Sequence, residues 1–282
     1  MTSCDRMLKD DESEVLANDE VAANFYLIRL FLPQTAAVAM PGQFVMLEAG
    51  SGTVPLLRVP LSVCAADVNS GTIDVLYENM GPKTAILSGV KPGAILRCMG
   101  PVGNAFLMPT NLPVLVGGGI GVPPLLFFGN VLSEAGVQAR LLVGARTETK
   151  LLPRALLDSA SADHVVATND GSAGHHGFVT ELLQEMLEQD HQVTVYACGP
   201  HSMMAAVAMI CRDHEVTCYV SLEEYMACGF GVCVGCVVPL SRIQTVPSTS
   251  PYHDYSRICV DGPVYDAREI EWDGGHTIGS HG

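Results

Sequence analysis

Four cysteines near the C-terminal end of the sequence have the spacing of iron–sulfur ligands. Cys228, Cys233 and Cys236 share one short stretch and Cys259 follows after a longer gap, which gives the pattern C-x4-C-x2-C…C. This is the ligand spacing of plant-type [2Fe–2S] sites, in which four thiolates hold two irons. Glycines between the cysteines allow the backbone to wrap around a cluster and bring N–H groups to the sulfurs. We therefore predict a [2Fe–2S] cluster bound by these four cysteines.

A structural zinc site is the alternative for the same cysteines, and thiols without any metal are a third. Zinc sites usually repeat a C-x2-C pair twice, whereas only Cys233 and Cys236 have that spacing here. The spacing favours iron and sulfide over zinc.

A glycine-rich turn in the middle of the chain is typical of a phosphate-binding loop. The apolar run 114–116 leads into Gly117–Gly121 and then into a helix expected over 123–135. Such a turn lets a diphosphate approach the free N–H groups at a helix N-terminus. Two further polar segments follow expected strands, at Asp170 and at 198–200, and would share the same sheet edge. A packing turn and an ordinary buried thiol at Cys198 remain the alternatives, but the combination favours a nicotinamide site.

Polar side chains in the N-terminal half are suited to a flavin. Arg58 precedes an expected strand, Tyr77 lies at the end of the next one, and Lys83 and Thr84 follow it. An arginine can clamp a pyrophosphate, a tyrosine ring can lie against a flavin, and Lys83 and Thr84 can donate to phosphate oxygens. By residue type alone, a solvated arginine and a core tyrosine are the default interpretation, and the flavin contacts are the alternative.

Two patterns of secondary structure must position these residues. Short β-like runs separated by turns predict a small antiparallel barrel, and alternating strands and helices predict a parallel sheet. The expected fold class is therefore a β-barrel plus an α/β domain, with a C-terminal iron–sulfur segment. The predicted divisions are a flexible N-terminus (1–18), an FAD-binding barrel (19–106), an NAD-binding α/β domain (107–222), and a cluster segment with a C-terminal tail (223–282).

Composition and charge exclude several classes of function. The 282 residues include 15 Lys and Arg against 30 Asp and Glu, a formal charge of −15 that argues against nucleic-acid binding. Residues 98–133 carry no charge and are long enough to cross a bilayer, but their glycines and prolines favour a strand, a turn and a helix. No signal-peptide pattern opens the sequence, and clustered thiols favour a reducing cytoplasm.

Several motifs together resemble the ferredoxin–NADP reductase superfamily, over residues of about 20–272. The C-terminal cysteines, closed by the run 259–265 (Cys-Val-Asp-Gly-Pro-Val-Tyr), narrow the likeness to the family of electron-transfer subunits of class 1B dihydroorotate dehydrogenases. The remaining motifs that carry the resemblance are Pro41-Gly42-Gln43-Phe44, Arg58-Val59-Pro60-Leu61-Ser62, the run 100–106, the run 117–124 and Cys198-Gly199-Pro200.

The resemblance implies that electrons pass between NAD, FAD, a [2Fe–2S] cluster and the FMN of a separate catalytic subunit. That partner would oxidise dihydroorotate to orotate in pyrimidine (UMP) biosynthesis, within a heterotetramer. Cys198 would lie near the nicotinamide as the one candidate catalytic residue. By resemblance, FAD contacts are Arg58, Val59, Pro60, Leu61, Ser62, Tyr77, Glu78, Asn79, Lys83 and Thr84, and NAD contacts are Gly118, Gly119, Gly121, Asp170, Cys198, Gly199 and Pro200.

The sequence departs from the family pattern at two places. Val59 stands where the family has an arginine before Pro60, so Arg58 must reach the pyrophosphate or flavin binding is altered. The stretch between Cys236 and Cys259 is longer than expected, and we expect a surface loop there, at or near the partner interface.

Two other readings remain open at this level. One keeps the cofactors but changes the partner to a hydrogenase or a ferredoxin-linked transhydrogenase. The other is a zinc-stabilised, non-enzymatic module that has lost its flavin.

Overall fold

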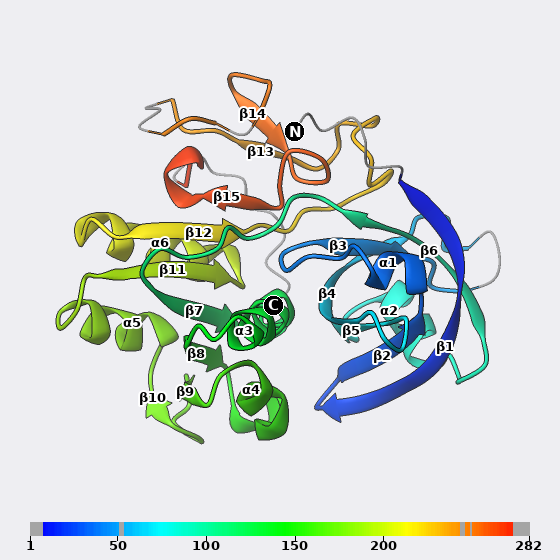
Figure 1. Ribbon diagram of the computed structural model, residues 1–282, viewed down its shortest axis with the longest axis horizontal. Helices are drawn as coiled ribbons and strands as arrows, with labels where there is room; N and C mark the ends of the chain where they lie inside the picture. Colours follow the sequence, from blue (N-terminus) through cyan, green and yellow to red (C-terminus); the bar gives the residue numbers. More distant parts are fainter. Residues whose placement is uncertain (1–7, 51–53, 243–245, 249, 273–282) are drawn as a thin grey trace.

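The computed structural model describes residues 8–50, 54–242, 246–248 and 250–272. Figure 1 shows a barrel on one side, a sheet covered by helices on the other, and the C-terminal segment running along both. The expected fold class is confirmed, because the barrel is closed and the core of the second sheet is parallel.

The barrel begins ten residues earlier than the sequence predicted. β1 starts at Lys9, so residues 9–18 are a barrel strand and not part of a flexible tail. Acidic side chains on the outer face of β1 hide its alternation, although Ser13 and Val15 point inward and are fully buried. The strands close in the order β1-β2-β5-β4-β3-β6. Their bounds are β1 Lys9–Ala22, β2 Phe25–Phe31, β3 Phe44–Leu47, β4 Val59–Asp67, β5 Thr72–Glu78 and β6 Ile95–Val102, with helices α1 Pro33–Ala36 and α2 Pro82–Ser88.

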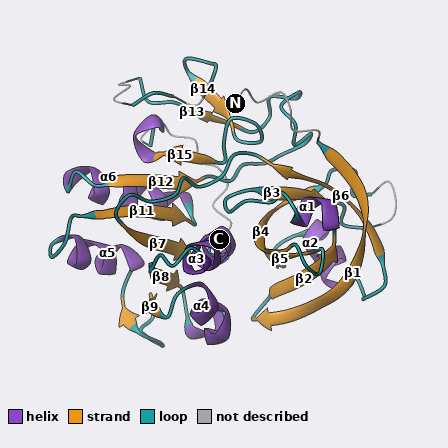
Figure 2. Ribbon diagram, viewed as in Figure 1, coloured by secondary structure: helices purple, strands orange, loops and turns teal. Residues whose placement is uncertain are grey.

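The second sheet has the order β10-β9-β8-β7-β11-β12-β15. Successive strands are added on one side of β7 up to β10, and from β11 onward they are added on its other side. In open sheets of this kind, ligands bind at the carboxyl ends of the strands at this switch point. Figure 2 shows the helices on the two faces of this sheet. The bounds are β7 Leu112–Gly118, η1 Gly119–Gly121, α3 Pro123–Glu134, β8 Arg140–Ala145, η2 Glu148–Lys150, α4 Arg154–Ala160, β9 Asp163–Thr168, β10 His175–His176, α5 Val179–Leu187, β11 Val193–Cys198, α6 His201–Asp213 and β12 Thr217–Ser221.

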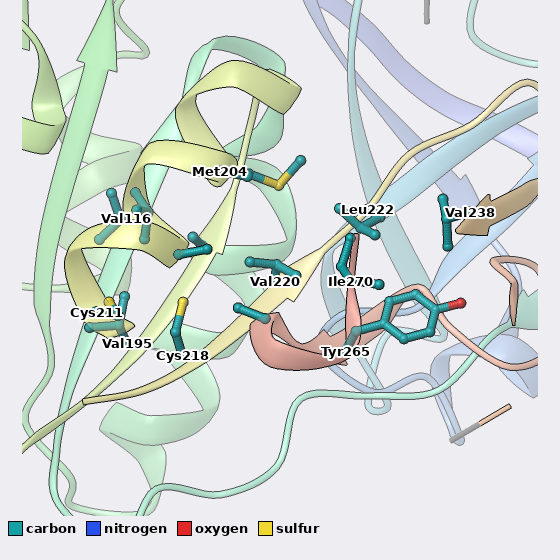
Figure 3. Close-up of a cluster of buried hydrophobic side chains, with 14 of the residues drawn as sticks. Val116, Val195, Met204, Cys211, Cys218, Val220, Leu222, Val238, Tyr265 and Ile270 are labelled. Atoms are coloured by element: carbon teal, nitrogen blue, oxygen red, sulfur yellow. The ribbon is translucent and has the colours of Figure 1, made fainter. Parts of the chain in front are cut away.

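The C-terminal segment is anchored to the second sheet. β13 (Val237–Pro239) and β14 (Tyr255–Arg257) form a hairpin, whereas β15 (Val264–Asp266), followed by η3 (Ala267–Glu269), pairs antiparallel with β12. Figure 3 shows Leu222, Val238, Tyr265 and Ile270 meeting in one apolar cluster beside β12. The segment is therefore a continuation of the fold and not a separate appendage.

A single buried cluster joins all three parts of the chain. It contains Met46 and Met99 of the barrel, Val116 and Val195 of the sheet, and Cys259 of the C-terminal segment. Among the described helices, none is long and apolar enough to cross a membrane, and the uncharged stretch 98–133 folds into β6, β7, η1 and α3.

Candidate redox site

The glycine turn and the Cys198–Pro200 turn meet at the reversal point of the sheet. Cys198 lies beside Gly117 in the register of β11 and β7. A Cβ atom at Gly121 would come within 2.4 Å of the Gly199 backbone nitrogen, so only glycine allows this approach. The predicted neighbourhood of the two motifs is therefore present.

Gly119 has a different reason to be glycine. Its φ is +53°, and a Cβ there would meet no atom within 4 Å. The turn thus leaves open space beside Gly119, where the backbone can come close to a phosphate, whereas Pro123 and Pro124 at the start of α3 have no N–H group to donate. Asp170 lies after β9, two strands from β7, and its carboxylate is used locally, because Ser172 donates to it through its N–H and its hydroxyl. The assignment of these residues to NAD stays a prediction.

Cys198 is a buried, neutral thiol. Burial, and next the nearby Glu223 carboxylate, raise the pKa of the Cys198 thiol well above its usual value, although a hydrogen bond from Ser221 opposes the change. A thiol in this state does not act as a nucleophile at neutral pH. Its place beside the glycine turn suits packing against a nicotinamide ring.

A cleft opens between the barrel and the second sheet, where the sequence predicted a flavin. Ile120 of the glycine turn lines it, so the predicted flavin and nicotinamide sites are continuous. Its other lining residues are Pro60, Leu61, Ser62, Leu76, Tyr77, Glu78, Met80 and Glu223.

Tyr77 borders this cleft but its side chain belongs to the barrel core. It is fully buried, stacks on Tyr26 with ring centroids 5.6 Å apart, and donates from its hydroxyl to Asn18 Oδ1 at 2.9 Å. Contact with a flavin would therefore involve the edge of the strand more than the face of the ring.

Five of the predicted flavin residues do not line the cleft: Arg58, Val59, Asn79, Lys83 and Thr84. Arg58 forms a two-pronged ion pair with Asp10 of β1, at 2.9 and 2.8 Å. Lys83 donates to the Arg58 carbonyl at 3.2 Å, and Thr84 accepts from the amides that precede α2. Asn79 bonds to Asn24 and Ser88 on the barrel, and Val59 opens β4. Arg58 thus ties barrel strands together, and its proposed role toward a pyrophosphate stays a prediction.

Sequence reasoning missed Glu223, which reaches the cleft from the second sheet. It follows directly on β12, at the edge where strands end and ligands bind. Glu223 has exposed surface, but its position in the cleft partly removes water from the carboxyl group, and this desolvation raises the pKa of Glu223. A carboxylate after the last parallel strand is the sequence signal that identifies it.

The four C-terminal cysteines lie together as two close pairs. Cys228 hydrogen-bonds with Cys233, whose backbone N–H also points at the Cys228 sulfur at 3.5 Å, and Cys236 shares a hydrogen bond with Cys259. A cluster with two irons needs two thiolates on each iron, so this pairing fits a [2Fe–2S] group.

The ligand loop also carries amides that stabilise thiolates. Burial raises the pKa of the Cys228 thiol, but N–H groups of Cys233, Phe230 and Val232 outweigh it and lower that pKa to about 7. The hydrogen bond with Cys259 lowers the pKa of Cys236 to about 6, and the same bond raises the pKa of Cys259. By contrast, burial raises the pKa values of Cys64 and Cys98 to about 12. Cys228 and Cys236 thus have lowered thiol pKa values, as suits metal ligands, whereas the core thiols Cys64 and Cys98 do not.

The ligand loop lies directly on the barrel. Gly229 has a φ of +76°, and a Cβ there would lie 2.6 Å from Met46 of β3 and 2.9 Å from Met99 of β6. At the other end, Asn104 after β6 bonds to the backbone of Val264 in both directions, at 2.8 Å each. These contacts hold the C-terminal segment, with its ligand loop, at the junction of barrel and sheet.

The class of protein is defined by three features: a closed antiparallel barrel, a mainly parallel sheet covered by helices, and a cysteine loop packed where the two meet. This is an oxidoreductase of the ferredoxin-reductase type that uses FAD, NAD and a [2Fe–2S] cluster. The family model of the iron–sulfur cluster binding domain of dihydroorotate dehydrogenase B matches residues 223–271, and that of the oxidoreductase NAD-binding domain matches residues 115–209.

Comparison with whole proteins gives the particular family. The chain is 34% identical over 95% of its length to the complete dihydroorotate dehydrogenase B (NAD(+)), electron transfer subunit, of Desulforamulus reducens. It is 35% identical over 94% of its length to 99% of the subunit of the same name from a Geobacillus species. The chain belongs to this family of electron transfer subunits.

Solved structures agree with the fold. A structure of the NADH-dependent reduced ferredoxin-NADP oxidoreductase, described in work on flavin-based electron bifurcation, has a TM-score of 0.81 at 29% identity. The superposition covers 93% of this chain and 90% of the chain of that oxidoreductase. A ferredoxin reductase in carbazole 1,9a-dioxygenase shares the fold, with a TM-score of 0.66 at 21% identity over 75% of this chain and 68% of its own.

Proposed function

We propose that this protein passes electrons between NAD(H) and the FMN of a dihydroorotate dehydrogenase catalytic subunit, in the synthesis of UMP. When bound, FAD exchanges two electrons with NAD(H) and single electrons with the [2Fe–2S] cluster. The observation that carries the proposal is that the ligand loop packs directly on the barrel strands β3 and β6, where Gly229 contacts Met46 and Met99. Electrons then need to cross only the barrel wall to reach the loop.

In this proposal the chain positions groups and does not take or give protons to a substrate. Gly118, Gly119, Gly121, Gly199 and Pro200 shape the nicotinamide side of the junction, and Cys198 packs there as a neutral thiol. Ser62 and Glu78 line the flavin side. Cys228, Cys233, Cys236 and Cys259 hold the cluster in the two pairs described above.

The proposed partner surface surrounds the ligand loop. Phe230, Val232, Val234 and Val260 are exposed apolar side chains next to the cluster cysteines, and Val232 is 73% exposed. Exposed apolar side chains gathered around a functional group are typical of docking surfaces. The catalytic subunit would cover them and so shorten the path to its FMN. Val232→Glu should weaken the complex in size-exclusion chromatography, and unchanged assembly would exclude this surface.

We place the protein in the cytoplasm as part of the same proposal. All cysteines within the described ranges are free thiols, although several are buried in the core. Free thiols and a thiolate-bound cluster are typical of a reducing compartment.

The test is anaerobic co-expression with the catalytic subunit and measurement of NADH-dependent orotate reduction. Cys233→Ser should abolish orotate reduction and lower the iron and sulfide content, while NADH still bleaches the FAD. Cys64→Ala, which removes a buried thiol away from the ligand loop, should keep both activities. An unchanged rate in Cys233→Ser would mean that electrons bypass this site.

A second candidate is favoured by one comparison. The 29% identity to the NADH-dependent reduced ferredoxin-NADP oxidoreductase over 93% of the chain is compatible with a ferredoxin-linked partner. NADH-dependent reduction of ferredoxin, without orotate reduction in the presence of the catalytic subunit, would select this function instead.

A further inference from the structure

The long connection between Cys236 and Cys259 folds into a hairpin that returns to the ligand loop. β13 and β14 pair directly after Cys236 and before Cys259, with Val237 opposite Arg257. At the turn, Ser250 Oγ accepts from the Tyr252 N–H at 3.1 Å and donates to the Tyr255 carbonyl at 2.8 Å. These bonds bring two tyrosines of the insertion into contact.

The two tyrosines form a stack with Arg257 on top. The rings of Tyr252 and Tyr255 lie 4.6 Å apart at an angle of 15°, and the Arg257 guanidinium lies 5.0 Å from the Tyr252 ring centroid. A guanidinium over an aromatic face is attracted by the negative face of the ring. The insertion thus covers one side of Arg257.

The other side of Arg257 bridges the two parts of the cluster site. Its Nη1 donates to the carbonyl of Gly231, between Cys228 and Cys233, at 3.2 Å. Its Nε and Nη2 donate to both carboxylate oxygens of Asp261, two residues beyond Cys259, at 3.0 and 3.3 Å. The side chains of Arg257 and Asp261 are only 19% and 9% exposed.

Gly231 packs closely against both Arg257 and Val260, which lies next to Cys259. Its φ is +84°, and a Cβ there would lie 3.1 Å from the Val260 methyl groups and 3.2 Å from Arg257 Nη1. Arg257 also receives the N–H groups of Val260 and Asp261 on its own carbonyl. The loop with three cysteines and the turn with the fourth are therefore joined through one side chain.

We propose that Arg257 is a positioning residue that locks the three-cysteine loop to the Cys259 turn, and that Tyr252, in the connection between Cys236 and Cys259, supports it by covering its guanidinium. This inference rests on the proposed binding of the cluster by the four cysteines. Groups around a metal site orient its ligands and tune it, and their loss typically costs 10–100-fold in metal affinity.

Two consequences separate this role from simple structural support. Without the guanidinium, the Gly231 carbonyl is released and the loop can open, so iron is lost faster. The Asp261 carboxylate is then uncompensated next to the cluster, and its negative charge disfavours addition of an electron. The midpoint potential of the cluster should therefore fall.

The experiment uses the anaerobically purified holoprotein with FAD and cluster bound. Iron release to a chelator is followed by bleaching, and the midpoint potential by EPR-monitored titration. Arg257→Met should release iron about tenfold faster and show a lowered potential. Arg257→Lys should keep the potential, because the charge remains, but release iron faster because one ammonium cannot bridge both partners. Tyr252→Leu should release iron faster than the wild type.

Arg268→Met is the matched control. Arg268 makes the same kind of two-pronged pair with Asp266, in the same C-terminal segment, but within the described residues its guanidinium hydrogen-bonds to Asp266 and does not bridge to the ligand loop. Release rates and potentials in Arg257→Met equal to those of Arg268→Met would overturn the proposal. If Arg257→Met does not fold, wild-type behaviour of both Arg257→Lys and Tyr252→Leu would overturn it equally. Absence of iron and sulfide from the wild type would instead reject the proposed function itself.

Discussion

Lys150 of η2 and Glu78 of the barrel form an ion pair that joins the two parts of the chain, with 2.6 Å between Nζ and Oε1. The Lys150 ammonium also donates to the Ala23 carbonyl at 3.2 Å and lies 5.1 Å from the Phe25 ring centroid. One cation thus holds the barrel against the second sheet's part of the chain, beside the cleft that Glu78 lines.

Lys150→Met should slow flavin reduction by NADH without displacing the flavin. We expect a loss of about fivefold, equivalent to the ~1 kcal/mol that a partly buried ion pair can contribute. Stopped-flow bleaching of FAD measures it. Arg140→Met removes an ion pair with Asp163 that lies within the second sheet, and should leave the rate unchanged. Equal rates in both variants would show that the pair does not align the two parts.

Gly119→Ala and Gly121→Ala should fail in different ways. At Gly119 there is room for a methyl group but φ is +53°, so the cost is about 1–2 kcal/mol of backbone strain and a raised KM for NADH. At Gly121 the new Cβ would collide with the Cys198–Gly199 backbone, so the fold itself should be lost or strongly destabilised. Thermal unfolding and NADH titration separate the two effects. A normal KM in a folded Gly119→Ala protein would argue against a dinucleotide at this turn.

Glu223→Gln should stabilise the protein at neutral pH. Burial raises the pKa of Glu223 in the folded state, so its charged form costs stability, and stability is lost as the pH rises through the folded pKa. The variant should therefore be more stable than the wild type at pH 8, and the difference should shrink toward pH 5. Urea unfolding across this range measures it, with Glu134→Gln on α3 as control. A less stable variant at pH 8 would mean that the carboxylate is held in its charged form.

Asp10→Asn should lower stability at neutral pH and not in acid. The hydrogen bond from Arg58, next to an opposing effect of burial, lowers the pKa of Asp10. A lowered pKa gives stability that is present above the unfolded value and lost as the pH falls through the folded one. Because Asp10 is 38% exposed, solvent screening limits the loss to below about 1 kcal/mol. Asp11→Asn on the same strand is the control, and equal unfolding free energies at pH 7 would contradict the prediction.

Local pattern was sufficient for much of the fold. The strand expected at 114–116, before the glycine turn, is β7, and the helix expected at 123–135, after the turn, is α3. α4 begins only at Arg154, because η2 and Pro153 precede it, and Lys150 therefore lies before the helix, where it reaches Glu78. β1 was missed because its outer face is acidic and its inner face shows only when the barrel closes around Ser13 and Val15.

The sequence alone determined the class of chemistry, and it predicts the four cysteine ligands. Cysteine spacing and glycine positions are local properties, and they are readable because thiolate geometry and positive φ each restrict residue type within a few positions. Tertiary structure alone decided which charges meet. Arg58 with Asp10, Lys150 with Glu78, and Arg257 with Gly231 are pairs separated by 26 to 72 residues. Such contacts depend on how the barrel, sheet and C-terminal segment pack, because that packing brings side chains distant in the chain within hydrogen-bonding reach.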